Sequence, residues 1–248
     1  MSKTILITGG SRGIGAATAI LAGRQKYQVC VNYLKNEVAA HKVVDEINHN
    51  GGKAAAYQAD VSNENEVIDL FQRIDKDFGN LYGLVNNAGI LEAQSRVVDL
   101  ELDRFQRIIN SNLMSCFLCS KEAIKRMSTS YGGAGGAIVN VSSIAARTGS
   151  PNEYVDYAAS KGAVDTFTIG LSKEVAGEGI RVNGVRPGFI YTDIHADGGE
   201  PNRVDRIKES LPLRRGGQPD EVANAIMWLL GEESSYSTGI LIDVTGGR

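Results

Sequence analysis

Tyr157 and Lys161 place a phenol and an ammonium group four residues apart, in a segment whose pattern predicts a helix. Residues i and i+4 lie on one face of a helix with about 3.6 residues per turn, so both groups can act on one small volume. A tyrosine has an ordinary pKa of about 10, and a neighbouring positive charge favours the phenolate and lowers that pKa. The pair therefore predicts acid-base chemistry near neutral pH, although the same spacing occurs on many helices without a catalytic role.

The bulk composition predicts one soluble α/β domain. The chain has 248 residues, of which 42% are hydrophobic and 22% charged, and one α/β domain of this length is common. A net charge of -3 gives no general attraction to nucleic acid or to anionic membranes. No apolar stretch approaches the roughly 20 residues that span a bilayer, and the N-terminus lacks the layout of a signal peptide. We therefore expect residues 1–248 to form a single cytoplasmic domain.

Short apolar runs alternate with amphipathic stretches along the chain, which favours a parallel sheet covered by helices on both faces. Strands are expected at residues 4–8, 29–33, 54–58, 82–85, 137–141, 181–185 and 240–242. Helices are expected at residues 13–26, 38–48, 64–77, 102–109, 113–127, 157–176 and 221–230. Residues 191–217 are the least regular region, and a long irregular segment of this kind predicts a substrate-binding loop or lid.

A glycine-rich loop follows the first expected strand and opens the first expected helix. After Thr8 the chain reads Gly9, Gly10, Ser11, Arg12, Gly13, Ile14 and Gly15. Glycines let the backbone approach a pyrophosphate, while the helix N-terminus supplies N–H donors and a partial positive charge. The spacing Gly-x-x-x-Gly-x-Gly differs from the commoner Gly-x-Gly-x-x-Gly, and a tight turn alone could explain it. Its place directly after the first strand favours nucleotide binding.

The end of the second expected strand decides between the two nicotinamide cofactors. An acidic residue there would bind a ribose 2′-hydroxyl and repel a 2′-phosphate. This chain instead has Asn32, Tyr33, Leu34 and Lys35, and its first carboxylate is Glu37. Arg12 and Lys35 could together neutralise a phosphate, or they could be solvated surface cations. We predict that NADP(H) is preferred over NAD(H).

With these segments in place, the sequence resembles the short-chain dehydrogenase/reductase family, in its single-domain branch, over essentially the whole chain. The loop from Thr8 to Gly15 matches the family's cofactor loop. The other matching motifs are Asp60 and Val61 at the adenine ring, Asn86, Asn87, Ala88 and Gly89 at the end of strand four, Pro187, Gly188, Ile190 and Thr192 at the nicotinamide, and the catalytic tetrad of Asn112, Ser143, Tyr157 and Lys161. Several independent motifs in the right order make this resemblance specific.

The resemblance implies a Rossmann fold, which is a doubly wound parallel sheet with the strand order 3-2-1-4-5-6-7. It also implies reversible hydride transfer between the nicotinamide and a carbonyl or secondary alcohol. Tyr157 would exchange a proton with the substrate oxygen, and Ser143 would hydrogen-bond that oxygen. Lys161 would hold the nicotinamide ribose and lower the pKa of Tyr157, while Asn112 would anchor a water chain to solvent.

The identity of the catalytic serine is open at this point. Ser143 and Tyr157 are fourteen positions apart, one more than is usual in the family. A one-residue insertion in the intervening loop would keep Ser143, which we prefer, and Ser142 is the alternative. Tyr154 is a second phenol nearby, but no lysine follows it four positions later.

The substrate class depends on charges around the site. Relatives that reduce 3-oxoacyl groups on an acyl carrier protein use basic residues to dock that acidic partner. Here Glu178 places an acid where a base would help, and Lys125 and Arg126 are typical of solvated charges on an exposed helix. We therefore rank a small free carbonyl or a sugar-like alcohol above a carrier-bound acyl chain.

The cysteines and histidines predict no metal site. Cys116 and Cys119 have Cys-x-x-Cys spacing, but no second cysteine pair accompanies them and no histidine stands at ligand spacing. A buried, inert pair is the favoured interpretation, and with Cys30 as the third cysteine no disulfide framework is expected. His195 is expected in a loop at the mouth of the substrate site.

Two further expectations concern assembly and the alternative function. The resemblance implies a homotetramer, or a dimer, formed through the helical segments 102–127 and 157–176. A catalytically idle NADP(H)-binding sensor or scaffold on the same fold is the alternative to an enzyme, because a fold does not determine a function. A sensor would not need the complete tetrad, so the tetrad favours the enzyme.

Overall fold

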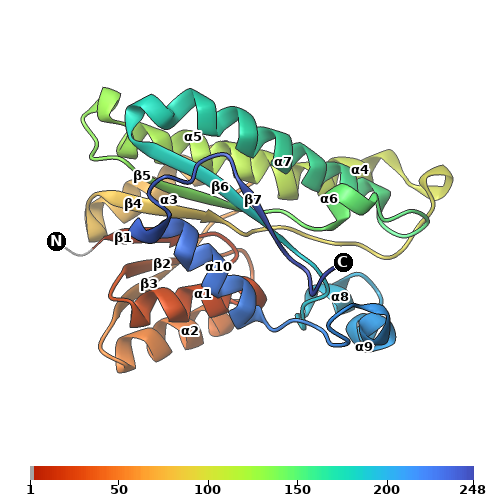
Figure 1. Cartoon of the computed structure of the whole chain (residues 1–248). Helices are drawn as coiled ribbons and strands as arrows, with labels where there is room; N and C mark the ends of the chain where they lie inside the picture. Colours follow the sequence, from red (N-terminus) through yellow and green to blue (C-terminus); the bar gives the residue numbers. More distant parts are fainter. Residues whose placement is uncertain (1–2) are drawn as a thin grey trace.

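The computed structural model describes residues 3–248, and its strands form one parallel sheet in the order β3-β2-β1-β4-β5-β6-β7 (Figure 1). The strands are β1 (Thr4–Ile7), β2 (Gln28–Tyr33), β3 (Lys53–Gln58), β4 (Leu81–Asn86), β5 (Gly136–Val141), β6 (Ile180–Pro187) and β7 (Leu241–Val244). The predicted strand order and the Rossmann fold are thereby confirmed. Every expected strand is present, and its ends lie within two residues of the expected ones.

The strand sequences suit a sheet that is covered on both faces. All four residues of β1 are buried, and so are five of the six residues of β5. Parallel strands of this kind are nearly continuous apolar runs, because helices pack against both of their sides. Polar strand residues such as Asn140 and Asn183 are buried only with hydrogen-bond partners, which are the hydroxyl of Thr168 and the carbonyl of Ser237.

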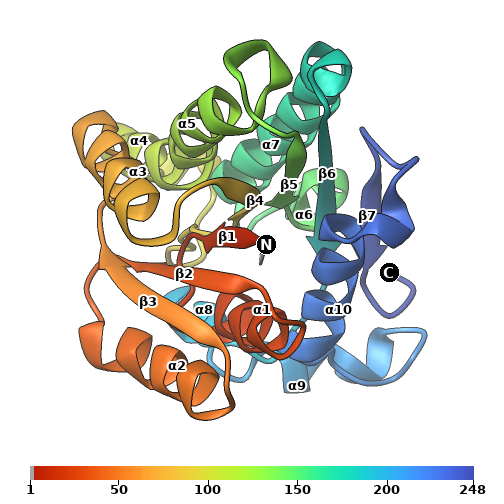
Figure 2. The same cartoon turned by 90° about the vertical axis from the view of Figure 1, so that its left-hand side faces the viewer.

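Helices cover the sheet in two layers (Figures 1 and 2). The first layer comprises α1 (Gly13–Arg24), α2 (Glu37–His49) and α10 (Pro219–Leu230), and the second α3 (Glu64–Phe78), α5 (Ser115–Met127) and α7 (Val155–Val175), with α4 (Leu102–Ile109) packed on α7. Each layer has its own buried cluster, with Ile226 in the first and Phe71 in the second. The strand order reverses between β1 and β4, so a crevice opens at the carboxyl ends of these strands.

The two helices expected at residues 102–109 and 113–127 are joined without a break. A π-helical turn, Asn110–Met114, connects α4 to α5 and contains Asn112. π-Helical turns are rare and frequently occur at functional sites. The sequence pattern predicted both helices but not the turn that connects them.

The segment 191–217 is less irregular than expected. It contains α8 (Ile194–Asp197) and α9 (Arg203–Ile207), and an additional short helix, α6 (Ala145–Thr148), lies before α7. Arg203 attaches α9 to its surroundings through ion pairs with Glu153 and Glu200. Within residues 3–248, no helix combines the length and the apolar character needed to cross a membrane.

Candidate active site

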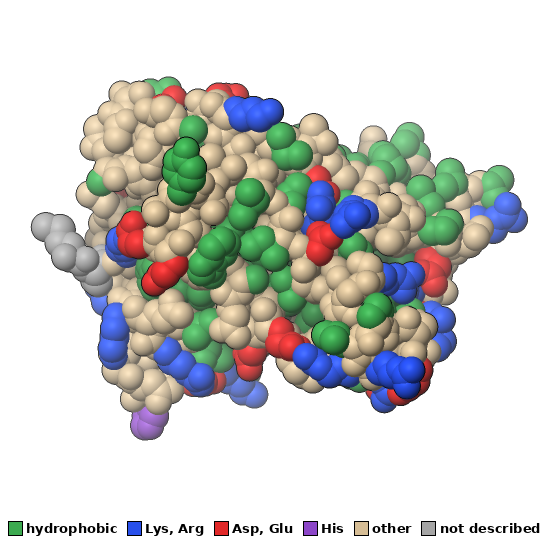
Figure 3. Space-filling view, in the orientation of Figure 1, with side chains coloured by type: hydrophobic (Ala, Val, Ile, Leu, Met, Phe, Trp, Pro, Cys, Tyr) green, Lys and Arg blue, Asp and Glu red, His purple; other side chains and the backbone are tan. Residues whose placement is uncertain are grey.

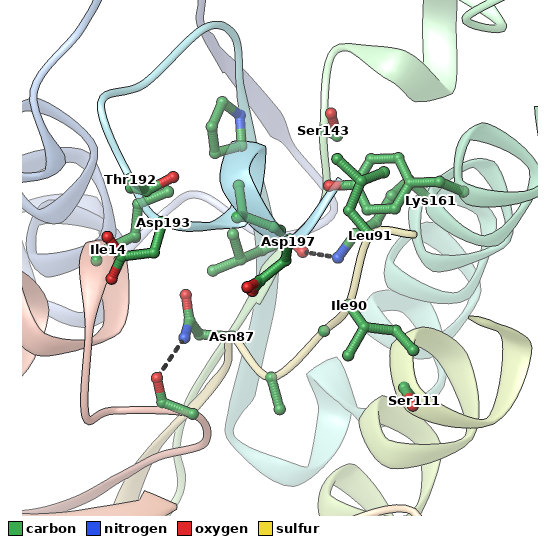
Figure 4. Close-up of a pocket in the computed structure, with 18 of the residues that line it drawn as sticks. Ile14, Asn87, Ile90, Leu91, Ser111, Ser143, Lys161, Thr192, Asp193 and Asp197 are labelled. Carbon is green, nitrogen blue, oxygen red and sulfur yellow. Dashed lines mark hydrogen bonds between the residues drawn. The ribbon is translucent and has the colours of Figure 1, made fainter. Parts of the chain in front are cut away.

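One large cleft, of about 1010 Å³, lies at the carboxyl ends of the central strands. Its lining includes the glycine loop, the end of β2, the end of β4, the tetrad residues Ser143, Tyr157 and Lys161, and the segment from Pro187 to Asp197. Figure 4 shows Ser143 and Lys161 on one side of the cleft and Ile14 and Thr192 on the other. The topology therefore brings the predicted cofactor residues and most of the tetrad to a single site.

The glycine loop packs closely against the neighbouring segments of the chain. Gly13 has φ +55°, in the left-handed region that favours glycine, and a Cβ there would lie 3.2 Å from Cγ2 of Thr192. Gly15 is more constrained, since a Cβ would lie 2.4 Å from the carbonyl oxygen of Gly9 and 2.5 Å from Nδ2 of Asn87. The loop can thus pack against its neighbours only with glycine at these positions, and it leaves the N-terminus of α1 facing the cleft.

Asn87 and Thr8 join the glycine loop to the end of β4. The Asn87 amide donates hydrogen bonds of 3.0 Å to the carbonyl oxygens of Thr8 and Gly9. The Thr8 hydroxyl in turn accepts bonds of 3.0 Å from the backbone N–H groups of Asn87 and Ala88. The Asn87 side chain therefore has a structural role, because it holds two backbone segments together. Its role beside the cofactor stays a prediction.

The end of β2 presents a cation and no carboxylate to the cleft. Tyr33 and Lys35 line the cleft, as do Asp60 and Val61 from the loop after β3. Asn32 also lies here, but its side chain is buried and bonded to the backbone, accepting from Gly9 N–H and donating to the carbonyls of Tyr57 and Ala59. We infer that the Asn32 amide supports the loop rather than facing a ligand.

Arg12 pairs with a carboxylate from another segment that lines the cleft. Its Nη2 lies 2.5 Å from Oδ2 of Asp197, the last residue of α8. Sequence reasoning paired Arg12 only with Lys35, and no local spacing connects Arg12 with a residue 185 positions away. Asp197 is the charged neighbour that the sequence did not reveal.

The residues present fit a dinucleotide. The cleft lies at the upper end of the range of about 300–1,000 Å³ that small-molecule pockets commonly measure. The glycine loop supplies a backbone surface with no side chain at Gly13 or Gly15, directly at a helix N-terminus that attracts phosphate.

Lys161 is held by the backbone of β5. Its Nζ donates a 2.8 Å hydrogen bond to the carbonyl oxygen of Val141 and lies 5.6 Å from the centroid of the Tyr157 ring. Lys161 is buried, and burial lowers the pKa of its ammonium to about 8. The i, i+4 spacing thus brings the two side chains together, as the sequence predicted.

The structure contradicts the expected lowering of the Tyr157 pKa. Burial raises the pKa of Tyr157 to about 12, and a hydrogen bond with Ser143 acts in the opposite direction without reversing the change. Removing the phenol from water penalises the phenolate, and Lys161, whose ammonium group is bonded to the Val141 carbonyl, does not lower the pKa. At neutral pH the phenol is therefore protonated, which is the form that donates a proton.

The two candidate serines have different surroundings. Ser142 is buried, and its hydroxyl donates a 3.1 Å bond to the carbonyl oxygen of Lys161. The Ser143 hydroxyl accepts a 3.1 Å bond from the N–H of Ala145 and interacts with Tyr157. Ser143 keeps its hydroxyl proton for another partner, so the geometry favours Ser143 for contact with a substrate oxygen.

Asn112 lies beneath the site rather than in its lining. Its Oδ1 accepts a 2.7 Å bond from the N–H of Ile90, and its Nδ2 donates to the carbonyl of Ile90 at 3.1 Å and to the hydroxyl of Ser160 at 3.0 Å. Asn112 therefore connects the chain after β4 to α7, close to Tyr157. Its predicted role as the anchor of a water chain stays a prediction.

The far end of the cleft mixes aromatic and charged groups. Tyr154 is buried, donates to the carbonyl of Gly198 at 3.2 Å, and lies 4.8 Å from the guanidinium of Arg203. His195 lies in α8 rather than in a loop; it is 9% exposed and lines the cleft. Its Nε2 bonds the carbonyl of Ile190 at 3.0 Å, and burial lowers its pKa.

The cysteines fit the predicted inert role. Cys30, Cys116 and Cys119 are all buried and free, and burial raises the pKa of the Cys116 thiol to about 12. No group of three metal-ligating side chains occurs in the described part of the chain.

The basic residues that could dock an acidic carrier already have acidic partners. Lys125 pairs with Glu122 at 2.6 Å, and Arg126 pairs with both Glu122 and Asp75 at 2.8 Å. Glu178 accepts a hydrogen bond from Ser128. Lys125 is exposed as expected, whereas the Arg126 side chain is only 18% exposed and is a half-buried ion-pair residue rather than a solvated charge.

Comparison with known proteins decides the family. A family model described as enoyl-(acyl carrier protein) reductase matches residues 9–248. The chain is 58% identical over 243 residues to the uncharacterized oxidoreductase YgfF of Escherichia coli (strain K12), covering 98% of each chain. The chain belongs to the short-chain dehydrogenase/reductase family. The resemblance seen in the sequence is thereby confirmed.

Other members of the family differ in the substrates that their names give. The chain is 39% identical to a 3-oxoacyl-[acyl-carrier-protein] reductase of Synechocystis, covering 99% of this chain and 96% of the relative. It is 36% identical to glucose 1-dehydrogenase 2 of Bacillus subtilis, covering 99% and 94%. A short-chain dehydrogenase from Burkholderia cenocepacia, solved in complex with NADP, superposes with a TM-score of 0.90 at 34% identity, covering 99% and 97%. The chain is thus an oxidoreductase of this family.

Sequence reasoning also missed an ion pair at the start of the helix that carries the family's tyrosine. Asp156 is buried and accepts a 2.8 Å bond from Nε of Arg104, which also donates to the carbonyl of Ala93. The backbone N–H of Tyr157 donates to the same carboxylate at 2.9 Å. An acid in the first turn of a helix is a recognisable signal, but its partner on α4 is 52 positions away and leaves no local pattern.

Proposed function

We propose that this short-chain dehydrogenase/reductase is an NADP(H)-dependent enzyme that interconverts a carbonyl and a secondary alcohol. The observation that carries the proposal is the meeting of Ser143, Tyr157 and Lys161 in the same cleft as the glycine loop. When bound, the nicotinamide cofactor supplies or accepts the hydride at the substrate carbon. The chain's own residues supply proton transfer, orientation and a site partly removed from water.

Each tetrad residue has a separate role in this proposal. During reduction the Tyr157 hydroxyl donates its proton to the carbonyl oxygen, and the Ser143 hydroxyl hydrogen-bonds the same oxygen. Lys161, fixed by its bond to Val141, stabilises the phenolate that remains and holds the ribose hydroxyls of the cofactor. Asn112 keeps the chain after β4 against α7 and, in this proposal, would anchor the water chain that returns the proton.

Cofactor preference is proposed from the charges at the end of β2. Arg12 and Lys35 line the cleft, and no carboxylate occupies residues 32–36. A 2′-phosphate would find two cations there, whereas a ribose 2′-hydroxyl would lack an acidic acceptor. The experiment is a side-by-side measurement of kcat/KM with NADPH and NADH. Equal efficiency with both would contradict the preference.

For the substrate, we propose a small free carbonyl or sugar-like alcohol rather than a carrier-bound acyl chain. Lys125 and Arg126 are engaged with Glu122 and Asp75, which leaves less positive charge to dock an acidic carrier. Residues 191–217, with α8 lining the cleft, would act as the substrate-binding lid. A panel of ketones, aldehydes and polyols, compared with acyl-carrier substrates, tests this ranking, and faster turnover of the latter would reverse it.

The central test replaces Tyr157 by phenylalanine. Tyr157→Phe should lower kcat by at least about 100-fold, the lower end of the usual contribution of general acid-base catalysis, while the Kd for NADP⁺ changes little. Tyr154→Phe is the matched control. The Tyr154 hydroxyl donates to the carbonyl of Gly198, so its loss should lower kcat far less than the loss of the Tyr157 hydroxyl. Normal turnover by Tyr157→Phe would disprove the proposed mechanism. Cofactor binding by the wild type without turnover of any panel member would support the sensor instead.

We also propose that the protein is a cytoplasmic homotetramer. Large apolar side chains are exposed on α4 and α5, namely Leu102, Phe105 and Phe117. Others, Ile169, Trp228 and Ile240, are exposed on α7, α10 and next to β7, where Figure 3 shows hydrophobic side chains on the facing surface. Exposed apolar side chains are typical of protein–protein interfaces, and a homotetramer would cover these. Light scattering that reports a monomer would contradict this assembly.

A further inference from the structure

We propose that Asp197 is a cofactor-specificity residue, which weakens the binding of NADP(H) relative to NAD(H) by engaging Arg12. This inference rests on the proposed function, in which Arg12 is one of two cations for the 2′-phosphate. The ion pair joins two segments that line one cleft, since Arg12 belongs to the glycine loop and Asp197 ends α8. Figure 4 shows Asp197 among the residues that line the middle of the cleft.

The contact is close and directed. Nη2 of Arg12 donates to Oδ2 of Asp197 at 2.5 Å. In the described part of the chain, Asp197 is the only carboxylate within ion-pair distance of Arg12, and Lys35 has none. Arg12, which belongs to the glycine loop, therefore has an anionic partner within the protein, whereas Lys35, the second cation of the proposed phosphate site, does not.

A 2′-phosphate and the Asp197 carboxylate would compete for the same guanidinium. NADP(H) gains the full benefit of Arg12 only after this ion pair is broken or distorted. NAD(H) carries no 2′-phosphate, so its binding does not depend on releasing Arg12 in this way. Asp197 thus reduces the discrimination that Arg12 and Lys35 would otherwise give.

The expected size of the effect is moderate because both side chains are partly in solvent. The Arg12 and Asp197 side chains are 50% and 44% exposed. Exposed pairs of this kind contribute little, and the corresponding change in Kd is about two- to fivefold. The effect should shrink as ionic strength rises, since salt screens exposed charges.

The experiment measures Kd values for NADP⁺ and NAD⁺ by calorimetry on wild type and Asp197→Asn. We expect Asp197→Asn to lower the Kd for NADP⁺ about two- to fivefold more than the Kd for NAD⁺. Asp193→Asn is the matched control: Asp193 is also an exposed carboxylate of the same segment that lines the cleft, but it forms no ion pair with Arg12. It should change the ratio of the two Kd values much less than Asp197→Asn does, because it does not engage the guanidinium that would bind the 2′-phosphate.

Arg12→Gln and the double variant Arg12→Gln/Asp197→Asn complete the test. The gain from Asp197→Asn should vanish when Arg12 is absent. Three results would overturn the inference. Asp197→Asn could leave the ratio of the Kd for NADP⁺ to the Kd for NAD⁺ unchanged, it could raise that ratio, or it could have the same effect with Arg12 as with Gln at position 12. The proposed cofactor preference fails separately, if Arg12→Gln does not weaken the binding of NADP⁺; in that case the premise of the inference is lost as well.

Discussion

Lys161 donates a 2.8 Å hydrogen bond to the carbonyl oxygen of Val141, the last residue of β5. This bond fixes an ammonium group in a buried position, 4% exposed, beside the Tyr157 ring. Burial lowers the pKa of Lys161 from 10.5 to about 8. Since one pKa unit corresponds to about 1.4 kcal/mol, holding the charged form here costs the folded protein about 3 kcal/mol. Because the buried ammonium group of Lys161 lowers the stability of the fold, we infer that this residue serves function.

The first prediction concerns Lys161→Met. We expect kcat to fall by at least about 100-fold, because the phenolate loses its stabilising charge. The free energy of unfolding at pH 7 should stay the same or rise by about 1–2 kcal/mol, since removal of the buried charge outweighs the penalty of an unpaired Val141 carbonyl. Urea unfolding and steady-state kinetics on the same preparations check both parts. A large loss of stability would show that Lys161 is needed by the fold.

The difference in the free energy of unfolding between the wild type and Lys161→Met should depend on pH in one direction. Lys161 has a lower pKa in the folded protein than in the unfolded chain, so between about pH 8 and 10.5 the unfolded chain binds more protons. The stability of the wild type relative to Lys161→Met should therefore be constant below pH 8 and rise from there to pH 10.5. A difference that does not change between pH 7 and pH 10.5 would contradict the lowered pKa.

The second prediction separates Ser143 from Ser142. Ser143→Ala should lower kcat about 100-fold, as expected for the loss of a hydrogen bond to the reacting oxygen, with little change in stability. Ser142→Ala should keep most of the turnover but lower the free energy of unfolding by about 1 kcal/mol, because its buried bond to the Lys161 carbonyl is lost. The reverse pattern in kinetics would identify Ser142 as the catalytic serine.

The sheet and the cofactor loop could be predicted because their causes are local. Alternating apolar runs and amphipathic stretches predict a parallel sheet, and the glycines after β1 allow the close contacts seen at Gly15. The i, i+4 rule likewise places Tyr157 beside Lys161. These features depend on residues that are near one another in the sequence.

The features that the sequence did not predict depend on distant contacts. The direction of the Tyr157 pKa change is set by burial, and spacing along a helix does not reveal how much water the surrounding chain excludes. The ion pair of Arg12 with Asp197 joins residues 185 positions apart. The π-helical turn contains Asn112, whose three hydrogen bonds to Ile90 and Ser160 exist only once the fold has formed.

The third prediction tests Asn112 as a connector. Asn112→Ala should lower the free energy of unfolding by about 2–4 kcal/mol, because it leaves both backbone groups of Ile90 unpaired, and it should also lower kcat. Asn110→Ala, an exposed asparagine in the same π-helical turn, should change neither quantity appreciably. Urea unfolding and kinetics on both variants make the comparison. Equal effects of the two substitutions would mean that the turn itself, not the Asn112 side chain, matters.

The fourth prediction concerns Gly15. In Gly15→Ala the new Cβ would meet the Gly9 carbonyl oxygen at 2.4 Å and Nδ2 of Asn87 at 2.5 Å, so the loop must shift and the bonds of Asn87 to Thr8 and Gly9 must lengthen. Overpacking of this kind costs about 1–3 kcal/mol, and a similar penalty on the binding surface raises the Kd for NADP⁺ by about tenfold or more. Calorimetry and urea unfolding measure the two effects.

Gly170 supplies the control for Gly15, because it is an exposed glycine within α7 where a Cβ would meet nothing within 4 Å. Gly170→Ala should raise the free energy of unfolding by about 0.5–1 kcal/mol, since glycine loses more backbone entropy than alanine on entering a helix. Its Kd for NADP⁺ should equal that of the wild type. If Gly15→Ala also bound NADP⁺ with wild-type affinity, the glycine loop would not be the surface on which the pyrophosphate rests, and the cofactor would have to bind elsewhere in the cleft.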